Sequence, residues 1–387
     1  MVSMLARVPR TPLSLDPLIA EAKRRARRRR WLILALLVIG AGATVATIEL
    51  RSTPRAGPAA VSAARTPSRW GDDWRVRLGV LPVVAYGASS VWAASMAPPQ
   101  DFHGQLVRLD PRTGKRLATF PVGWWPSQIA VGAGGAWVAD TWGDGSRVKD
   151  GIPGFANAVT RIDPAVNRVV ATIRIPGVQA VTVGGGSAWA TAIGLRDSRE
   201  TIIRIDPATN RATTLRAIPG VNGPVVWGGS RLWALTWFAD PTLHARVWEI
   251  DPQSGRVIAS LVVPGIGPNA ALAYRSGVLW VGDTGLLTWI RTRPRLSIGR
   301  RERVGNANDL VTTQRGIWAS GDRTLFFLGL HGGAMNGELA LHGWVSPAGN
   351  ALAASGAHAW IVTQTATPTN VVSHLVAVHE QGAKTAR

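Results

Sequence analysis

The chain has 387 residues, among them 43 Gly, 25 Pro and 18 Trp, and it contains no Cys. The lack of Cys excludes disulfides, thiolate metal sites, a cysteine nucleophile and a cysteine-linked lipid anchor. Short apolar runs separated by Gly and Pro predict many strands joined by tight turns rather than a helical enzyme. The formal charge of +20 is explained more simply by a solvated basic surface than by an anionic partner.

Residues 1–30 form a basic tail, and residues 31–50 form an apolar run whose only charge is Glu49. Twenty helical residues span about 30 Å, the thickness of the hydrocarbon core of a bilayer. The segment KRRARRRR at 23–30 precedes this run, so the positive-inside rule predicts a single-pass membrane protein with a cytoplasmic N-terminus and an extracytoplasmic remainder.

Two questions about this N-terminal region stay open in the sequence. Residues 23–30 could hold anionic lipid, although setting the topology is the simpler role, and we expect no nucleic acid there because the segment abuts the bilayer. A cleavable signal peptide is the alternative to the anchor, with Ala41-Gly42-Ala43 as the cleavage site. Residues 51–71, rich in Pro, Ala and Arg, predict a linker.

From residue 72 to residue 387 a unit of strand, Gly-rich turn and Trp recurs at intervals of 38–52 residues. Intervals of this size are typical of a four-stranded propeller blade, and the seven repeats therefore predict seven blades. The seven markers are Trp92, Trp137, Trp189, Trp233, Trp280, Trp318 and Trp360.

A second marker, Asp-Pro followed by Asn or Gly, occurs in the first four repeats and predicts a tight turn between the third and fourth strands. Its acidic residues are Asp110, Asp163, Asp206 and Asp251. The fifth and sixth repeats lack this turn, so we expect those two blades to be irregular.

The seventh repeat is one strand short, whereas residues 74–80 alternate like a strand and have no partner of their own. We predict that residues 74–80 complete the last blade, because closing the ring removes exposed sheet edges. The predicted fold is thus an all-β, seven-bladed β-propeller preceded by a single transmembrane helix.

The segments GAWVAD, RIDPATN and VVATIRIPG resemble the YVTN-type and streptogramin-lyase-like β-propeller repeats of bacterial exported proteins. The resemblance implies the fold but not one function, because such propellers include enzymes, binding modules and scaffolds. The lyase family implies a divalent metal held by paired His and a Glu near the central channel. The seven His of this chain do not share a position in the repeat, so we predict no resident cofactor.

The insertion that follows the second marker Trp supplies the only weak candidates for a Ca or Mg site. Asp140, Asp144 and Asp150 could provide oxygen ligands, but their spacing matches no calcium loop.

In a propeller, the loops that enter the innermost strands share one face with the loops that join the second and third strands. We call the former interblade loops, and here they carry neutral amides at Gln128, Gln179, Asn222, Asn269, Asn308 and Asn350. These amides could bind sugars or carbonyl groups, or could simply satisfy turn geometry. Aromatic candidates on the same face, which could stack on sugars or anchor a protein, are Trp124, Trp125, Trp142, Trp237, Phe238 and His244.

These features together predict a membrane-anchored, extracytoplasmic binding or scaffold module of the cell envelope, with a protein or glycan as its partner. The alternative is a metal-dependent lyase- or lactonase-like enzyme with its site at the mouth of the central channel. No Ser-His-Asp arrangement, phosphate loop, dinucleotide fingerprint or zinc pattern is evident in the sequence.

Overall fold

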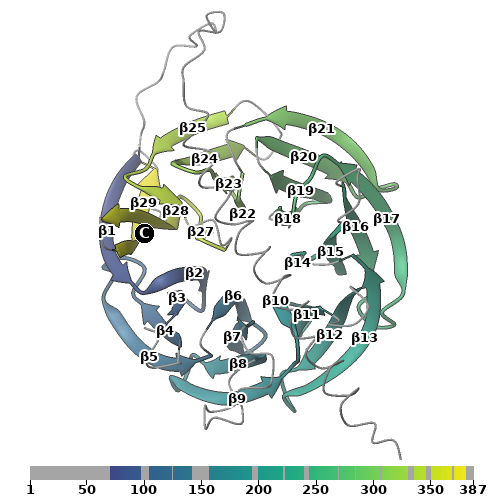
Figure 1. The fold of residues 1–387 in the computed structure, drawn as a ribbon, viewed down its shortest axis with the longest axis horizontal. Helices are drawn as coiled ribbons and strands as arrows, with labels where there is room; N and C mark the ends of the chain where they lie inside the picture. The colour runs from purple at the N-terminus through teal and green to yellow at the C-terminus, as the bar shows by residue number, and fades with distance from the viewer. Residues whose placement is uncertain are drawn as a thin grey trace, which may run out of the picture. The chain divides into compact units, whose positions relative to one another are not determined.

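Seven antiparallel sheets surround a central axis in the computed structural model (Figure 1). The structure describes residues 70–96, 104–123, 125–141, 157–193, 199–220, 223–238, 244–268, 270–283, 285–304, 307–329, 335–345, 350–367 and 370–380. Every regular element in these ranges is a strand, which confirms the predicted all-β, seven-bladed propeller.

The basic tail, the expected membrane span at 31–50 and the linker up to residue 69 lie outside the described residues. In the ranges that the structure describes, no helix is long and apolar enough to cross a membrane.

Blades 1–4 are each built from four consecutive strands. Blade 1 comprises β2 (Val80–Gly87), β3 (Ser90–Met96), β4 (Gly104–Leu109) and β5 (Arg116–Val122). Blade 2 comprises β6 (Pro126–Gly132), β7 (Gly135–Asp140), β8 (Ala158–Asp163) and β9 (Arg168–Arg174). Blade 3 comprises β10 (Val178–Gly184), β11 (Ser187–Ile193), β12 (Arg199–Asp206) and β13 (Arg211–Pro219). Blade 4 comprises β14 (Val225–Gly228), β15 (Arg231–Phe238), β16 (His244–Ile250) and β17 (Val257–Pro264).

Blades 5 and 6 also have four strands each, so the expectation that they are irregular was wrong. The fourth strand of each blade pairs with the third without the Asp-Pro turn, and blade 5 turns at Arg293-Pro294 instead. Blade 5 comprises β18 (Ala271–Arg275), β19 (Val278–Asp283), β20 (Leu286–Arg291) and β21 (Ser297–Arg303). Blade 6 comprises β22 (Asp309–Thr312), β23 (Gly316–Ser320), β24 (Thr324–Gly329) and β25 (Met335–Ala340).

The seventh blade joins the two ends of the described chain. Its strands are β27 (Leu352–Ser355), β28 (His358–Thr367), β29 (Asn370–Glu380) and β1 (Trp70–Leu78), with β26 (Trp344–Val345) beside β28. β1 pairs antiparallel with β29 as the outermost strand. The segment 74–80 therefore contributes residues 74–78 to β1, whereas Val80 already begins β2.

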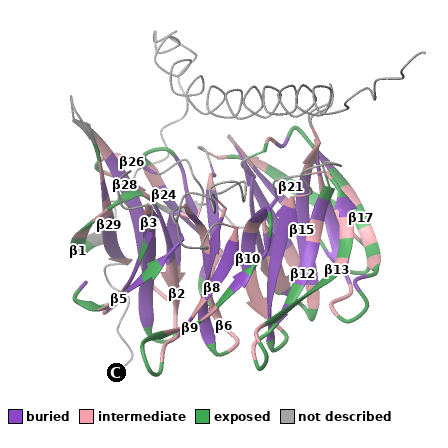
Figure 2. Ribbon diagram, turned by 60° about the horizontal axis from the view of Figure 1, so that its bottom comes forward, coloured by how far each residue is buried: buried purple, intermediate pink, exposed green. Residues whose placement is uncertain are grey.

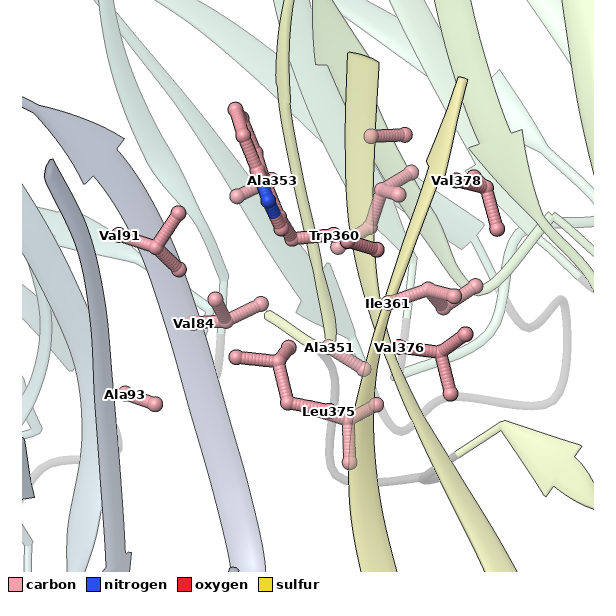
Figure 3. Close-up of a cluster of buried hydrophobic side chains, with 14 of the residues drawn as sticks. Val84, Val91, Ala93, Ala351, Ala353, Trp360, Ile361, Leu375, Val376 and Val378 are labelled. Atoms are coloured by element: carbon pink, nitrogen blue, oxygen red, sulfur yellow. The ribbon is translucent and has the colours of Figure 1, made fainter. Parts of the chain in front are cut away.

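The core lies between the blades rather than inside one layer. Each innermost strand contacts the innermost strand of the next blade, and β27 contacts β2, so the ring is closed. At this closure Val84 and Val91 of blade 1 face Trp360 and Leu375 of blade 7 in one buried cluster (Figure 3). Figure 2 shows buried residues within the blades and exposed residues at the turns and along outer strands such as β13 and β17.

The seven marker Trp residues occupy the second strand of each blade, and each is at most 3% exposed. In blades 1–4 the indole Nε1 donates a hydrogen bond to the carbonyl of the Gly five residues earlier, at 2.9–3.1 Å. The Gly-rich turn therefore supplies a carbonyl acceptor for the buried indole N–H, which would destabilise the fold if it had no hydrogen-bond partner.

Candidate functional site

The innermost strands of all seven blades enclose a central channel of about 570 Å³. Each of these strands follows an interblade loop, so their first residues meet at one end of the channel, the channel mouth. The polar lining residues Ser127, Gln128, Gln179, Asn308 and Asn350 lie at this end. Further along the strands the lining is mainly apolar, as at Ile129, Val131, Val225, Leu272, Leu310 and Leu352.

Two of the predicted amides are joined to each other across the mouth. Gln128 Nε2 donates to Asn350 Oδ1 at 3.0 Å, although the two residues are 222 positions apart in the sequence. Asn350 Nδ2 donates to the carbonyl of Ser127 at 3.0 Å, and Gln128 Oε1 accepts from the backbone N–H of Val181 at 2.9 Å. These bonds connect blades 7, 2 and 3, so both amides stabilise the ring as well as line the channel.

The other two described amides at the mouth do not hydrogen-bond to each other. Gln179 Nε2 donates to the carbonyl of Gly177 at 3.3 Å, and Asn308 Nδ2 donates to Asp322 Oδ1 at 3.1 Å. Asn222 and Asn269 lie outside the described residues. The structure therefore brings four of the six predicted amides, Gln128, Gln179, Asn308 and Asn350, to one channel.

Asp309 is a channel residue that the sequence analysis did not select. Its Oδ1 accepts from the N–H of Leu310 and its Oδ2 from the N–H of Leu352, both at 2.9 Å. Burial raises the pKa of Asp309 to about 6, and the backbone donors oppose that rise only in part. It is the only carboxylate among the described residues that line the channel.

A sequence signal for Asp309 did exist. In each blade, one residue of the innermost strand pairs with the marker Trp, and Asp309 lies two residues before that partner in blade 6. The other six blades carry a neutral residue at the same position. The neutral equivalents are Val83, Gln128, Ala180, Pro224, Ala271 and Ala351.

Asp140, which was considered as a calcium ligand, is a fully buried group at the end of β7. Thr160 Oγ1 lies 3.5 Å from Oδ2, and a Cβ on Gly123 would stand 2.4 Å from the carboxyl carbon, so only Gly fits there. Burial raises the pKa of Asp140 well above its ordinary value, which favours a neutral acid inside the blade rather than a charged metal ligand. Asp144 and Asp150 lie outside the described residues.

The described residues contain no group of three or more His, Asp or Glu close enough together to hold a metal ion. Within the ranges that the structure covers, the chemistry of the channel mouth is therefore that of neutral amides, backbone groups and one carboxyl.

The predicted aromatic platform is present only in part among the described residues. Phe238 of β15 and His244 of β16 stack with ring centroids 4.8 Å apart and planes at 10°, and Trp237 precedes Phe238 on β15. Phe238 also packs against the buried cluster between blades 3 and 4. Trp125 belongs to the interblade loop of blade 2, where its carbonyl accepts from the N–H of Thr141 at 3.1 Å. Trp124 and Trp142 lie outside the described residues.

No protein-family model and no curated protein matches this sequence. Solved β-propellers are similar in fold at low sequence identity. A putative 6-phosphogluconolactonase from Bacteroides uniformis aligns with TM-score 0.50 and 11% identity over 67% of this chain and 84% of that chain. A chain of a mitotic checkpoint complex aligns with TM-score 0.55 and 11% identity over 83% and 98% of the two chains.

A protein from Lactobacillus plantarum aligns with TM-score 0.50 and 13% identity over 67% of this chain and 84% of that chain. Identities this low show the fold alone. The class that fold and channel define is therefore a seven-bladed β-propeller.

Proposed function

We propose that this protein is a membrane-anchored, extracytoplasmic binding or scaffold module of the cell envelope, with its ligand at the channel mouth. The observation that carries the proposal is the channel itself, a cavity of about 570 Å³ with neutral amides at one end and apolar walls beyond them. Cavities of this size and composition are typical of small-molecule or side-chain binding sites.

The chemistry of the mouth favours an uncharged ligand group. Gln128 Nε2 donates to Asn350 and Asn350 Nδ2 donates to Ser127, and each amide has a second N–H beyond that bond. Gln179 adds a third amide to the lining. The carboxyl of Asp309 is directed toward two backbone N–H groups, so it does not offer a free charge. A neutral glycan or an uncharged segment of an envelope protein satisfies these donors and acceptors.

A pull-down tests this binding directly. The full chain in detergent micelles is presented to envelope fractions and to neutral oligosaccharides, together with Gln179→Ala and Trp125→Ala variants. Thr213→Ala, on the exposed face of β13, is the matched control. We expect wild type and control to retain the same partner and Gln179→Ala to retain at least several-fold less. Equal retention by all variants would contradict a site at the channel mouth.

The membrane anchor is proposed from the sequence, namely the apolar run 31–50 and the basic segment 23–30 before it. Because the chain has no Cys, a single introduced Cys reports the topology cleanly. We expect Thr213→Cys to react with a membrane-impermeant maleimide on intact cells and Ser3→Cys to react only after lysis. The opposite pattern, or recovery of the protein in the soluble fraction, would overturn the anchor and the orientation.

We also propose that the blades belong with the YVTN-type and streptogramin-lyase-like repeats, on the strength of the GAWVAD and RIDPATN segments. A metal-dependent lyase or lactonase is the competing function. Stoichiometric Mg²⁺ or Ca²⁺ in the purified protein, lost in Asp309→Asn, would favour that enzyme over the binding module.

A further inference from the structure

One kind of polar contact, from an Arg of one blade to a turn of the next blade, recurs around the ring. At one junction between blades the Arg is present without this contact. In blade 1, Arg108 lies opposite the marker Trp92 across two paired strands, with its guanidinium 5.2 Å from the ring centroid. Its Nη1 donates to the carbonyl of Pro164 at 2.6 Å and to Asn167 Oδ1 at 2.7 Å. Both acceptors belong to the Asp-Pro turn of blade 2, so one Arg fastens two blades.

The same arrangement joins blades 2 and 3. Arg161 lies opposite Trp137 with its guanidinium 4.9 Å from the ring centroid. Its Nη1 donates to the carbonyl of Pro207 and to Asn210 Oδ1, and its Nη2 donates to the carbonyl of Gly134. We call this contact the arginine latch.

Between blades 3 and 4 the Arg is present but the latch is not formed. Arg204 lies opposite Trp189, 5.7 Å from its ring centroid, and its Nε donates to Ser187 Oγ at 3.0 Å. The turn of blade 4 has Gly255 where the turns of blades 2 and 3 have an Asn, so the amide acceptor is gone. Arg204 is exposed, whereas Arg108 and Arg161 are half-buried. No hydrogen bond of its Nη groups is found among the described residues.

A cleft of about 550 Å³ lies at this junction. Trp189, Trp227 and Pro252 form its apolar walls, and the two indoles are stacked with centroids 5.9 Å apart. Arg204 and Arg231 supply two guanidinium groups. Trp227 also occupies the position on the innermost strand that Val131 and Val183 occupy in blades 2 and 3.

The cleft retains a positive charge that internal partners only partly offset. Arg231 Nε lies 3.6 Å from Glu249 Oε1, but the same oxygen also accepts from Arg293 at 3.0 Å. Asp251 also lines the cleft, and its Oδ1 accepts the backbone N–H groups of Gln253 and Ser254 at 3.0 and 2.8 Å. The carboxylate of Asp251 therefore makes its hydrogen bonds within its own turn, while its charge still interacts with Arg231 and that of Asp206 interacts with Arg204.

We propose that this cleft binds a carboxylate carried on a flat apolar body, with Arg204 as its main ligand-binding residue. The carboxylate takes the place of the turn carbonyl and Asn oxygen that satisfy Arg108 and Arg161. A planar guanidinium matches a carboxylate with two parallel hydrogen bonds, and the accessible part of the half-buried Trp227 indole can pack against a flat ring. An aromatic acid has this chemistry directly, and a uronic acid residue of a glycan shares its carboxylate and offers the C–H face of its sugar ring to the indole.

This site is distinct from the channel mouth. The cleft is built from the turns between first and second strands, at Gly185 and Ser230, and between third and fourth strands, at Asp251–Gln253. These turns lie at the opposite ends of the strands from the interblade loops. A ligand in the cleft therefore leaves the channel mouth free.

Calorimetric titration of the full chain in detergent micelles tests the proposal. The probes are 2-naphthoate, with neutral 2-naphthamide as its charge control, and a galacturonate trimer, with a neutral galactose trimer as its control. We expect at least one acid to bind in the millimolar range or tighter, and its neutral counterpart to bind at least tenfold more weakly. The arm that binds identifies the source of the carboxylate.

Arg204→Met keeps the apolar stem over Trp189 and removes the guanidinium, and we expect it to weaken acid binding at least tenfold. Arg256→Met is the matched control, because Arg256 is exposed on the neighbouring blade 4, does not line the cleft and carries the same charge. Cooperative thermal melting of both variants shows that they fold. The proposal is overturned if neither acid binds, if the neutral probes bind equally well, or if the two variants lose affinity equally. Loss of partner retention in Gln179→Ala is a separate outcome and tests only the channel mouth.

Discussion

Blades 1–4 and blades 5–7 have the same strand order but hold their marker Trp residues differently. In blades 1–4 a Gly carbonyl accepts from the indole, and a charged residue, Arg108, Arg161, Arg204 or Glu249, lies opposite the ring. In blades 5–7 the opposite residue is Trp289, Phe327 or Ala377. The charged residue and the Gly carbonyl that accompany the marker Trp in blades 1–4 are thus not required for the fold. Apolar packing at the same positions builds the same blade.

The seventh blade departs furthest from the first four, because its outer strand comes from the other end of the propeller. Deleting β1 (Trp70–Leu78) should expose the edge of β29 and the closure cluster around Trp360. We expect the cooperative unfolding transition to disappear, since the deletion unpairs β29 and removes the hydrogen bond from Trp74 Nε1 to the carbonyl of Pro111 in blade 1. Circular dichroism melting measures this, and Trp74→Ala is the milder control. A deletion variant with a wild-type transition would show that closure by β1 does not hold the ring.

Blade 6 differs from the others by its buried acid at the channel. The folded protein holds the pKa of Asp309 at about 6, above the ordinary 3.8, so the protonated form is favoured in the fold. The stabilising contribution is therefore complete below about pH 4 and is lost as pH rises to about 6, by roughly 3 kcal/mol. Urea unfolding at pH 4, 5, 6 and 7 measures this slope. Asp309→Asn should flatten it, and an unchanged slope in that variant would contradict the assignment.

The two formed latches and the unformed one permit a matched pair of substitutions. Arg161→Met removes bonds to Pro207, Asn210 and Gly134 from a half-buried site, and should cost about 2 kcal/mol. Arg204→Met removes only the single, partly buried bond to Ser187 and should cost less than about 1 kcal/mol. Chemical unfolding of both variants checks the difference. Equal losses would mean that Arg204 has partners that the latch comparison does not reveal.

The sequence predicted the number of blades because each buried Trp has to be preceded by a tight turn, and both leave a local signature. It did not predict the channel-mouth contacts, since Gln128 and Asn350 meet only when the ring closes. The missing latch at Arg204 was equally hidden. Its cue is one Gly in place of Asn at position 255, and that cue acquires meaning only when the turn of blade 4 is known to face blade 3. Contacts within a blade are thus local in sequence, whereas the site residues are positioned by contacts between blades.

The smallest predicted change in stability gives the most direct comparison of blades 1–4 with blades 5–7. Trp137→Phe and Trp360→Phe remove the same part of a buried indole, so their losses of apolar burial are similar. Trp137 Nε1, however, donates to Gly132 at 3.0 Å, whereas Trp360 Nε1 has no hydrogen-bond partner among the described residues. We therefore expect Trp137→Phe to be more destabilising by about 1 kcal/mol, the worth of one hydrogen bond. Paired denaturant titrations resolve this difference. If Trp360→Phe were the costlier change, its stacking on Tyr86 at 4.8 Å would outweigh the polar contact, and apolar packing would dominate in both halves.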